Sequence, residues 1–408
     1  MVIHRYAENI YLRGIRFFDR VRGEDHSDAP RKKAVVFICR QPLGDAVLST
    51  IVLRGVRKAY EGAHLFVVTS RANRTFFEAS SYADEVLVLE DTVHRVKKQR
   101  RLVREFCREH FRDYDVQLAI IPNTGMPNIF EAFLTHYSGA KRRAAASEVF
   151  HPVMHREYMG QYDAFFTDVY EEERVCHEVE SNLAMLSMLG VKEDLVIEVF
   201  STAADKERAD ALLAPHRDEL AGKVKLFVNP ATSDVARDYP VERYAEICRR
   251  LREEKEIACI LLGYGEKAAR YSGAFCAEIP EAIDLTNKTT IGEMIEIIRQ
   301  TDFYLGGDTG PLHIAAALKK QGVAVFRSSD GMPPLALDHI KRHPWDCGIV
   351  TMRPEHALAG CESGCRRKEA HCILQVCAED VYRALHGQLD ADERKSDARN
   401  GVHADVES

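Results

Sequence analysis

Short apolar runs alternate with amphipathic segments along most of this 408-residue chain. Each run has the length of one buried strand, and a segment with helical periodicity follows it. The runs fall into two sets, at 34–39, 65–69, 85–89 and 116–121, and then at 225–230, 257–263, 301–305 and 322–326. Continuous apolar strands that alternate with helices are typical of βαβ units, whose parallel sheets are covered on both faces. The sequence therefore predicts an α/β protein built from two units of similar size.

The spacing of these runs also predicts domain boundaries. The first unit spans 31–192 and the second 223–387, with 193–222 as the joint between them. Residues 388–408 combine many charges with few apolar side chains, a composition typical of disorder, so we expect a disordered tail there.

Residues 1–30 form a separate segment in which five arginines are interleaved with aliphatic and aromatic side chains. This pattern suits a basic amphipathic helix lying in a bilayer interface, and it suits equally a helix packed on the protein's own surface. Neither a secretory signal nor an apolar run long enough to span a membrane is evident. The expected location is the cytoplasm, with contact to the inner face of the cytoplasmic membrane left open.

Composition excludes some function classes. The apolar fraction of 46% and charged fraction of 29% are those of a soluble globular protein, and a net charge of −7 argues against nucleic-acid binding by bulk charge. Most of the eleven cysteines are isolated, which favours a reducing compartment.

The stretch 306–318 follows the strand predicted at 301–305 and leads into an alanine-rich helix. Its first half reads Gly-Gly-Asp-Thr-Gly-Pro. A glycine-rich turn that opens a helix presents backbone N–H groups at the positive end of the helix dipole, and both favour an anion. The same turn also fits a purely structural role, so both interpretations stay open at this point.

Several motifs, in order along the chain, resemble those of glycosyltransferase family 9, the heptosyltransferases. They lie at 43–54, 229–233, 239–244, 261–266, 284–290 and 306–318, with weaker agreement at 138–143 and 177–183. The resemblance runs from about 34 to 385. The chain departs from the family pattern at Arg237, where members usually have Lys, and at Tyr239, where they tend to have Trp. Arginine keeps the charge that binds a diphosphate, so these departures bear on donor preference.

The resemblance implies a GT-B architecture, in which two Rossmann-like parallel-sheet domains face a cleft. It implies an inverting glycosyltransferase that moves heptose or a related sugar from a nucleotide-sugar, ADP-heptose in the first place, to a lipopolysaccharide-core-type acceptor. The expected partners are the nucleotide-sugar and a lipid-linked oligosaccharide, with no nucleic acid, no cofactor and no metal. Two alternatives remain: a GT-B transferase with another donor, and a catalytically idle nucleotide-sugar or glycan-binding protein.

The resemblance also implies roles for particular residues. Asp45 is the expected general base, because a carboxylate at this turn can take the proton of the acceptor hydroxyl. The expected donor-binding residues are Thr232, Ser233, Arg237, Glu266, Asp308, Thr309, Gly310 and His313. Arg237 would contact the diphosphate and Glu266 the ribose, whereas His313 is expected to be a packed histidine. For Asp45 alone, a carboxylate that merely complements the helix dipole is the competing interpretation.

Two further clusters are less specific. Lys97, Lys98, Arg100 and Arg101 form a basic segment that suits a phosphorylated acceptor, or else a solvated helix face. Four cysteines at 361, 365, 372 and 377 lack the two-residue spacing of zinc knuckles. We therefore expect them to be a structural feature without metal.

Overall fold

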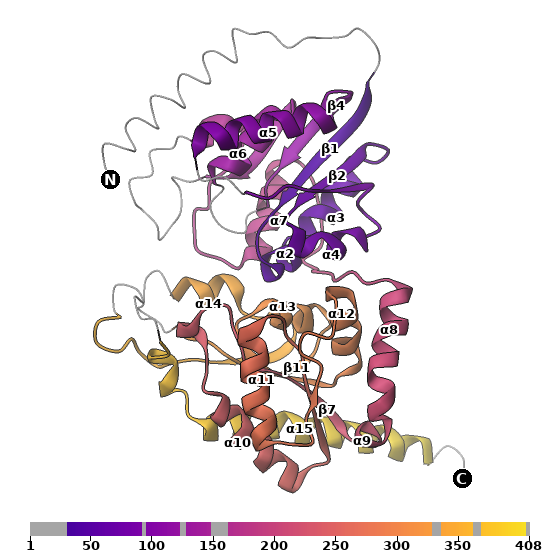
Figure 1. Cartoon of the computed structure of the whole chain (residues 1–408), viewed down its shortest axis with the longest axis vertical. Coiled ribbons are helices and arrows are strands. Elements are labelled where there is room, and N and C mark those ends of the chain that lie inside the picture. The colour runs from indigo at the N-terminus through magenta and orange to yellow at the C-terminus, as the bar shows by residue number, and fades with distance from the viewer. Residues whose placement is uncertain are drawn as a thin grey trace.

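The computed structural model describes residues 31–91, 95–122, 128–147, 162–328, 336–361 and 369–404. Figure 1 shows two α/β units, one above the other, and each contains a six-stranded parallel sheet. All eight predicted strands are present, and the predicted α/β class is confirmed. Residues 1–30, for which an interfacial or packed helix was predicted, lie outside the described residues.

The first unit has the strand order β3-β2-β1-β4-β5-β6. Its strands are β1 (Lys32–Cys39), β2 (His64–Thr69), β3 (Glu85–Val88), β4 (Tyr114–Ile120), β5 (Arg142–Ala146) and β6 (Asp168–Tyr170). Its helices are α2 (Leu43–Leu48), α3 (Thr50–Ala59), α4 (Arg74–Glu78), α5 (Val96–Phe111), α6 (Ile129–Tyr137) and α7 (Glu178–Met188), with short 3₁₀ turns η1 (Arg71–Asn73) and η2 (Asp163–Phe165).

The second unit has the strand order β12-β11-β10-β7-β8-β9. Its strands are β7 (Val224–Asn229), β8 (Ile257–Leu261), β9 (Ile283–Asp284), β10 (Phe303–Gly307), β11 (Gln321–Val325) and β12 (Gly348–Met352). Its helices are α8 (Ala203–Leu213), α9 (Arg217–Leu220), α10 (Val241–Glu254), α11 (Glu266–Glu278), α12 (Ile291–Gln300), α13 (Gly310–Ala317), α14 (Ala336–Arg342) and α15 (Ala378–Ala404), with 3₁₀ turns η3 (Ala214–His216), η4 (Val235–Arg237) and η5 (Cys372–Gln375).

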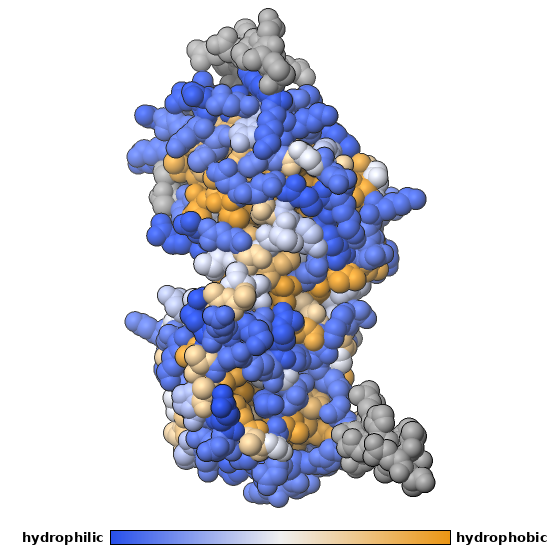
Figure 2. Space-filling view, turned by 90° about the vertical axis from the view of Figure 1, so that its right-hand side faces the viewer, coloured by the Kyte–Doolittle hydropathy of each residue, from blue (hydrophilic) through white to orange (hydrophobic). Residues whose placement is uncertain are grey.

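Strand β1 shows why the apolar runs are continuous rather than alternating. Val35 and Phe37 belong to one hydrophobic cluster, whereas Val36 and Ile38 belong to another on the opposite face. Because helices cover both faces of the sheet, every position of the strand is buried and apolar. The first of these clusters continues into the second unit and includes Ile314 of α13, so the two units share apolar contact. In the space-filling view the two lobes join at a narrower waist (Figure 2).

The predicted disordered tail is wrong over 388–404, where α15 continues as a helix. Leu389 is 2% exposed and packs in the core of the second unit. Two of its carboxylates pair with one cation: the Lys255 ammonium lies 2.7 Å from Asp390 Oδ1 and 2.6 Å from Glu393 Oε2. These contacts and the burial of Leu389 hold the start of the segment against the second unit.

The predicted joint at 193–222 contains α8, which packs on α12 of the second unit. Arg208 of α8 holds this contact, with its Nε 2.5 Å from Glu293 Oε1. No helix in the described part of the chain combines the length and hydropathy needed to span a membrane.

Candidate active site

Two helix N-termini, one from each unit, meet at close range. Strand β1 leads into α2 and strand β10 leads into α13, and these two helices contact each other. Glycines permit the approach: a Cβ on Gly44 would lie 2.7 Å from Cδ2 of His313, and a Cβ on Gly310 would lie 3.2 Å from Cβ of Leu43. The carboxyl ends of two parallel sheets therefore face each other here, which is where open α/β sheets bind ligands.

Asp45 lies in the first turn of α2 and is 8% exposed. Its Oδ1 is 3.3 Å from Nε of Arg342, the last residue of α14 in the second unit. An adjacent guanidinium favours the ionised carboxylate. Arg342 was missed by the sequence analysis, because an arginine in a short polar helix carries no periodic or motif signal.

A buried cluster of charged groups adjoins Asp45. The Lys341 ammonium lies 2.6 Å from Glu172 Oε2, an ion pair that binds α14 to the first unit, and 3.8 Å from Glu178 Oε1. Burial raises the pKa of Glu178 to about 8, while Lys341 and Arg342 oppose the rise and Asp45 adds to it. Two carboxyls therefore lie near each other in different environments, with Glu178 protonated at neutral pH.

The predicted donor-binding loop is partly assembled. Arg237 donates from Nη1 to Asp308 Oδ2 over 3.0 Å and from Nη2 to Ser233 Oγ over 2.7 Å. The structure thus brings Arg237, Ser233 and Asp308 together between β7 and β10. Among the described residues, the buried Nε of Arg237 has no hydrogen-bond partner.

Two predicted threonines have partners within the protein. Thr232 donates its hydroxyl to the Asp234 carbonyl oxygen at 2.7 Å and lies 2.9 Å from Asp238 Oδ1, so its proton is used inside the loop. The hydroxyl of Thr309 accepts from Asn229 Nδ2 at 3.1 Å. Contact of either residue with the donor stays a prediction.

Glu266 is exposed and begins α11 beyond the carboxyl end of β8. Its neighbour Tyr264 is 89% exposed. Between them, Gly265 has φ of 93°, a conformation that favours glycine, and its N–H donates to Asn287 Oδ1 at 2.6 Å. Lys267 links this turn to the Arg237 loop, because its ammonium donates to the Thr232 carbonyl oxygen at 2.8 Å. The role of Glu266 at the ribose remains a prediction.

His313 is 3% exposed and lies between the two halves of the site, against Gly44. Burial first, and then the nearby Arg342, His343 and Arg237, lower its pKa to about 3. The imidazole is therefore neutral at physiological pH, in accord with the expected packed histidine. His313 Nε2 also lies 3.9 Å from Asp308 Oδ1, the carboxylate that pairs with Arg237, so the ring contacts the donor loop as well as α2.

The basic cluster of α5 lies apart from this site. In Figure 1, α5 is on the upper part of the first unit, whereas α2 lies at its lower end, facing the second unit. Lys97, Arg100 and Arg101 line a surface groove of about 300 Å³, and Lys98 is exposed beside it. Arg100 donates to the Tyr137 hydroxyl and Arg101 pairs with Glu105. Acceptor binding by these residues stays a prediction.

The four cysteines do not form one cluster. Cys361 and Cys372 lie together with His371, whereas Cys377 donates to Asp380 Oδ2 at 2.8 Å. Cys365 lies outside the described residues.

Two Rossmann-like units whose glycine-rich βα turns meet define a GT-B protein. Residues 153–338, just under half of the chain, match the family model "Glycosyltransferase family 9 (heptosyltransferase)". A curated relative, lipopolysaccharide heptosyltransferase 1 of Campylobacter coli, is 27% identical over 145 residues, which cover 34% of this chain and 40% of that protein's length.

Solved structures support the same fold. A glycosyltransferase family 9 protein of Veillonella parvula superposes with a TM-score of 0.69 at 16% identity, covering 89% of this chain and 99% of that one. ADP-heptose lipopolysaccharide heptosyltransferase II of E. coli gives 0.64 at 16% identity, covering 88% and 99%. The E. coli heptosyltransferase WaaC with ADP gives 0.60 at 14% identity, covering 86% and 98%.

Proposed function

We propose that this protein is an inverting glycosyltransferase that moves heptose, or a related sugar, from a nucleotide-sugar to a lipopolysaccharide-core-type acceptor. The observation that carries the proposal is that His313 contacts both halves of the site. Its ring lies against Gly44, the neighbour of Asp45, and its Nε2 is 3.9 Å from Asp308 Oδ1, which holds Arg237. A carboxylate on the first unit and cations on the second are what sugar transfer between two substrates requires.

The second unit supplies the groups for the donor. Arg237 is held by Asp308 and Ser233, and a forked guanidinium binds two phosphate oxygens at once. The first turn of α13 adds the positive end of a helix dipole. Together these groups offset the charge that develops on the nucleoside diphosphate as it leaves, the step at which fixed donors have the largest effect.

Asp45 supplies the base. Its carboxylate accepts the proton of the acceptor hydroxyl while the hydroxyl oxygen bonds to the anomeric carbon and the diphosphate oxygen departs. Attack from the face opposite the leaving group inverts the configuration. The Arg342 guanidinium lies 3.3 Å from Asp45 Oδ1 and offsets its negative charge, and the neutral Glu178 adds no further charge.

ADP-heptose is the donor we propose. Two of the superposed enzymes carry ADP or ADP-heptose in their names, and Arg237 provides the diphosphate contact that any such donor needs. The acceptor is proposed from the curated relative, which acts on lipopolysaccharide by its name. Because that acceptor is lipid-linked, we further propose that transfer takes place at the inner face of the cytoplasmic membrane.

The test combines binding with turnover. ADP-heptose is expected to raise the melting temperature of both the wild-type protein and Asp45→Asn, whereas UDP- and GDP-sugars are not. The Asp45→Asn variant is expected to lose transfer by about 10²–10⁴-fold, the range of a general base. Stabilisation by a UDP-sugar alone would overturn the proposed donor, retained turnover would remove Asp45 from the mechanism, and no binding of any donor would favour an idle module.

A further inference from the structure

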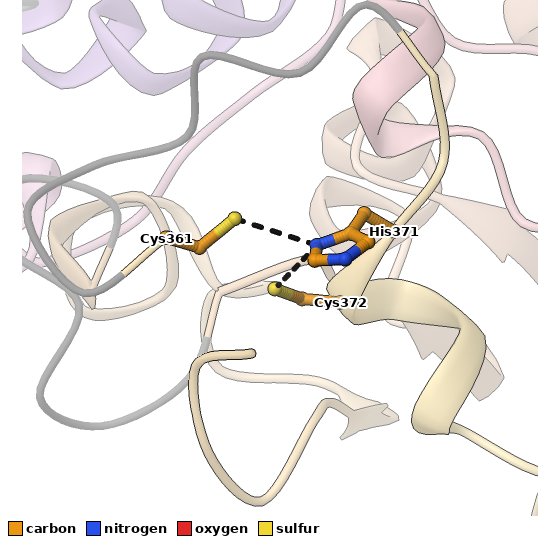
Figure 3. Close-up of side chains that lie close together, drawn as sticks. All are labelled: Cys361, His371 and Cys372. Atoms are coloured by element: carbon orange, nitrogen blue, oxygen red, sulfur yellow. Dashed lines mark hydrogen bonds between the residues drawn. The ribbon is translucent and has the colours of Figure 1, made fainter. Parts of the chain in front are cut away.

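A Cys-His-Cys cluster lies in the second unit between β12 and α15, outside the site described above. Figure 3 shows the side chains of Cys361, His371 and Cys372 pointing toward one another. His371 Nδ1 is 3.4 Å from Cys361 Sγ and 3.6 Å from Cys372 Sγ, and the three atoms all lie within 4.8 Å of one another. We propose that these three side chains bind one Zn²⁺ ion.

The distances fit a tetrahedral centre. With zinc–sulfur and zinc–nitrogen bonds of about 2.3 and 2.05 Å, tetrahedral angles place the sulfur and nitrogen ligands about 3.6 Å apart. Both measured separations agree with this value within about 0.2 Å. The cluster therefore needs little rearrangement to accept the ion.

The surroundings of the sulfur atoms support a thiolate site. Cys361 is 0% exposed and Cys372 5% exposed, whereas His371 is partly exposed. The backbone N–H of Leu358 donates to Cys372 Sγ at 3.4 Å. Hydrogen bonds to ligand atoms orient them and stabilise their charge. Neither cysteine is in a disulfide, so binding would release the thiol protons.

The neighbours of Cys372 along the chain are anchored elsewhere, because Ile373 and Val376 pack in the core of the second unit. The two cysteines form a small apolar cluster of their own with Ala357 and Leu358, separate from the large cores. The described residues supply three protein ligands, and Cys365 has no part in the proposal.

A metal ion here would brace the donor-binding loop. Cys372 begins η5, and the Val376 carbonyl oxygen just beyond it accepts from Tyr239 Oη at 3.1 Å and from Arg243 Nη1 at 2.7 Å. Tyr239 lies two residues after Arg237, which contacts the donor in the proposed function. The site is therefore structural, and its loss should affect donor binding more than the chemical step.

The primary experiment measures metal rather than turnover, so it stands whether or not the proposed function is right. Untagged full-length protein, purified with reductant and without chelator, is analysed by elemental mass spectrometry. We expect about one zinc per chain in the wild type and in Cys377→Ser, the matched control whose sulfur contacts Asp380. We expect at least a tenfold loss of zinc in Cys361→Ser and Cys372→Ser.

A second measurement tests the site even if the cysteine variants fold poorly. Cobalt titrated into the metal-free wild type should give the intense visible bands of a tetrahedral thiolate site, and His371→Ala, at a partly exposed position, should weaken them. Chelation should lower the melting temperature by several degrees and raise the KM for ADP-heptose with kcat little changed. Three results would overturn the proposal: no stoichiometric zinc or cobalt, iron in place of zinc, or a disulfide between Cys361 and Cys372 in the purified protein.

Discussion

Replacing Gly44 with alanine tests whether the two units must approach through their helix N-termini. The new Cβ would lie 2.7 Å from Cδ2 of the buried His313, and ordinary van der Waals contact begins near 3.4 Å. The facing helices must therefore move apart by about 0.7 Å, since His313 is enclosed and its ring cannot swing into solvent. Overpacking of this kind costs about 1–3 kcal/mol of stability.

The effect on activity should exceed the effect on folding. A displacement near 1 Å between reacting groups reduces rates by about a hundredfold, so kcat of Gly44→Ala should fall about tenfold to a hundredfold. Donor affinity should change little, because the groups around Arg237 all belong to the second unit. Steady-state transfer kinetics and donor titration by calorimetry measure the two quantities.

A matched glycine provides the control. A Cβ on Gly273, inside α11, would meet nothing within 4 Å, so Gly273→Ala should leave kcat unchanged. A kcat for Gly44→Ala equal to that of the wild type would refute the reasoning, because the units would then not need this approach. Loss of donor binding in Gly44→Ala would also contradict it.

Three further predictions concern stability. The pKa of Glu178 is raised to about 8 from an ordinary value near 4.5, so the folded protein binds this proton more tightly than the unfolded chain does. The stability that Glu178 contributes therefore falls as pH rises from about 5 to 8. Glu178→Gln should remove that decline in a series of melting temperatures against pH, and an unchanged slope would contradict the assignment. Lys341→Met leaves two buried carboxyls without their cation and should lower the free energy of unfolding, measured with denaturant, by about 3–5 kcal/mol. The control Lys319→Met removes an exposed ion pair and should lower it by under about 1 kcal/mol. Leu389→Ala should cost about 2–5 kcal/mol, and a value near zero would restore the disordered tail.

The strands that build the two sheets were predictable because both faces are covered. Runs such as 34–39 are apolar at every position, and the glycine-rich turns that follow β10 stand out by composition. Other strands of the same sheets were missed for physical reasons. Strand β5 begins with two arginines, β6 has three residues, and β12 lies at the sheet edge with exposed positions. In such strands too few positions are buried for the sequence to show a continuous apolar run.

The candidate site was only half predictable. Asp45, Arg237 and the 306–318 turn each follow a strand, so their place at a sheet edge could be inferred from the order of elements. Arg342 could not, because its pairing with Asp45 depends on how α14 of one unit packs on the other. The environment of Glu178 was not predictable either, because Lys341 and Arg342, which oppose the rise of its pKa, belong to the second unit.

His313 explains why the glycine-rich turns have the composition they do. A histidine in an alanine-rich helix next to a proposed catalytic carboxylate invites an acid-base role, yet its pKa near 3 leaves it neutral at physiological pH. Its ring instead fills the space that Gly44 leaves open, and so fixes the separation of α2 and α13. Because Arg237 and Arg342 both act on this ring, a protonated histidine would add a third cation to a crowded site. A neutral and enclosed side chain is what the position requires, and it sets the distance between the proposed base on one unit and the proposed diphosphate contacts on the other.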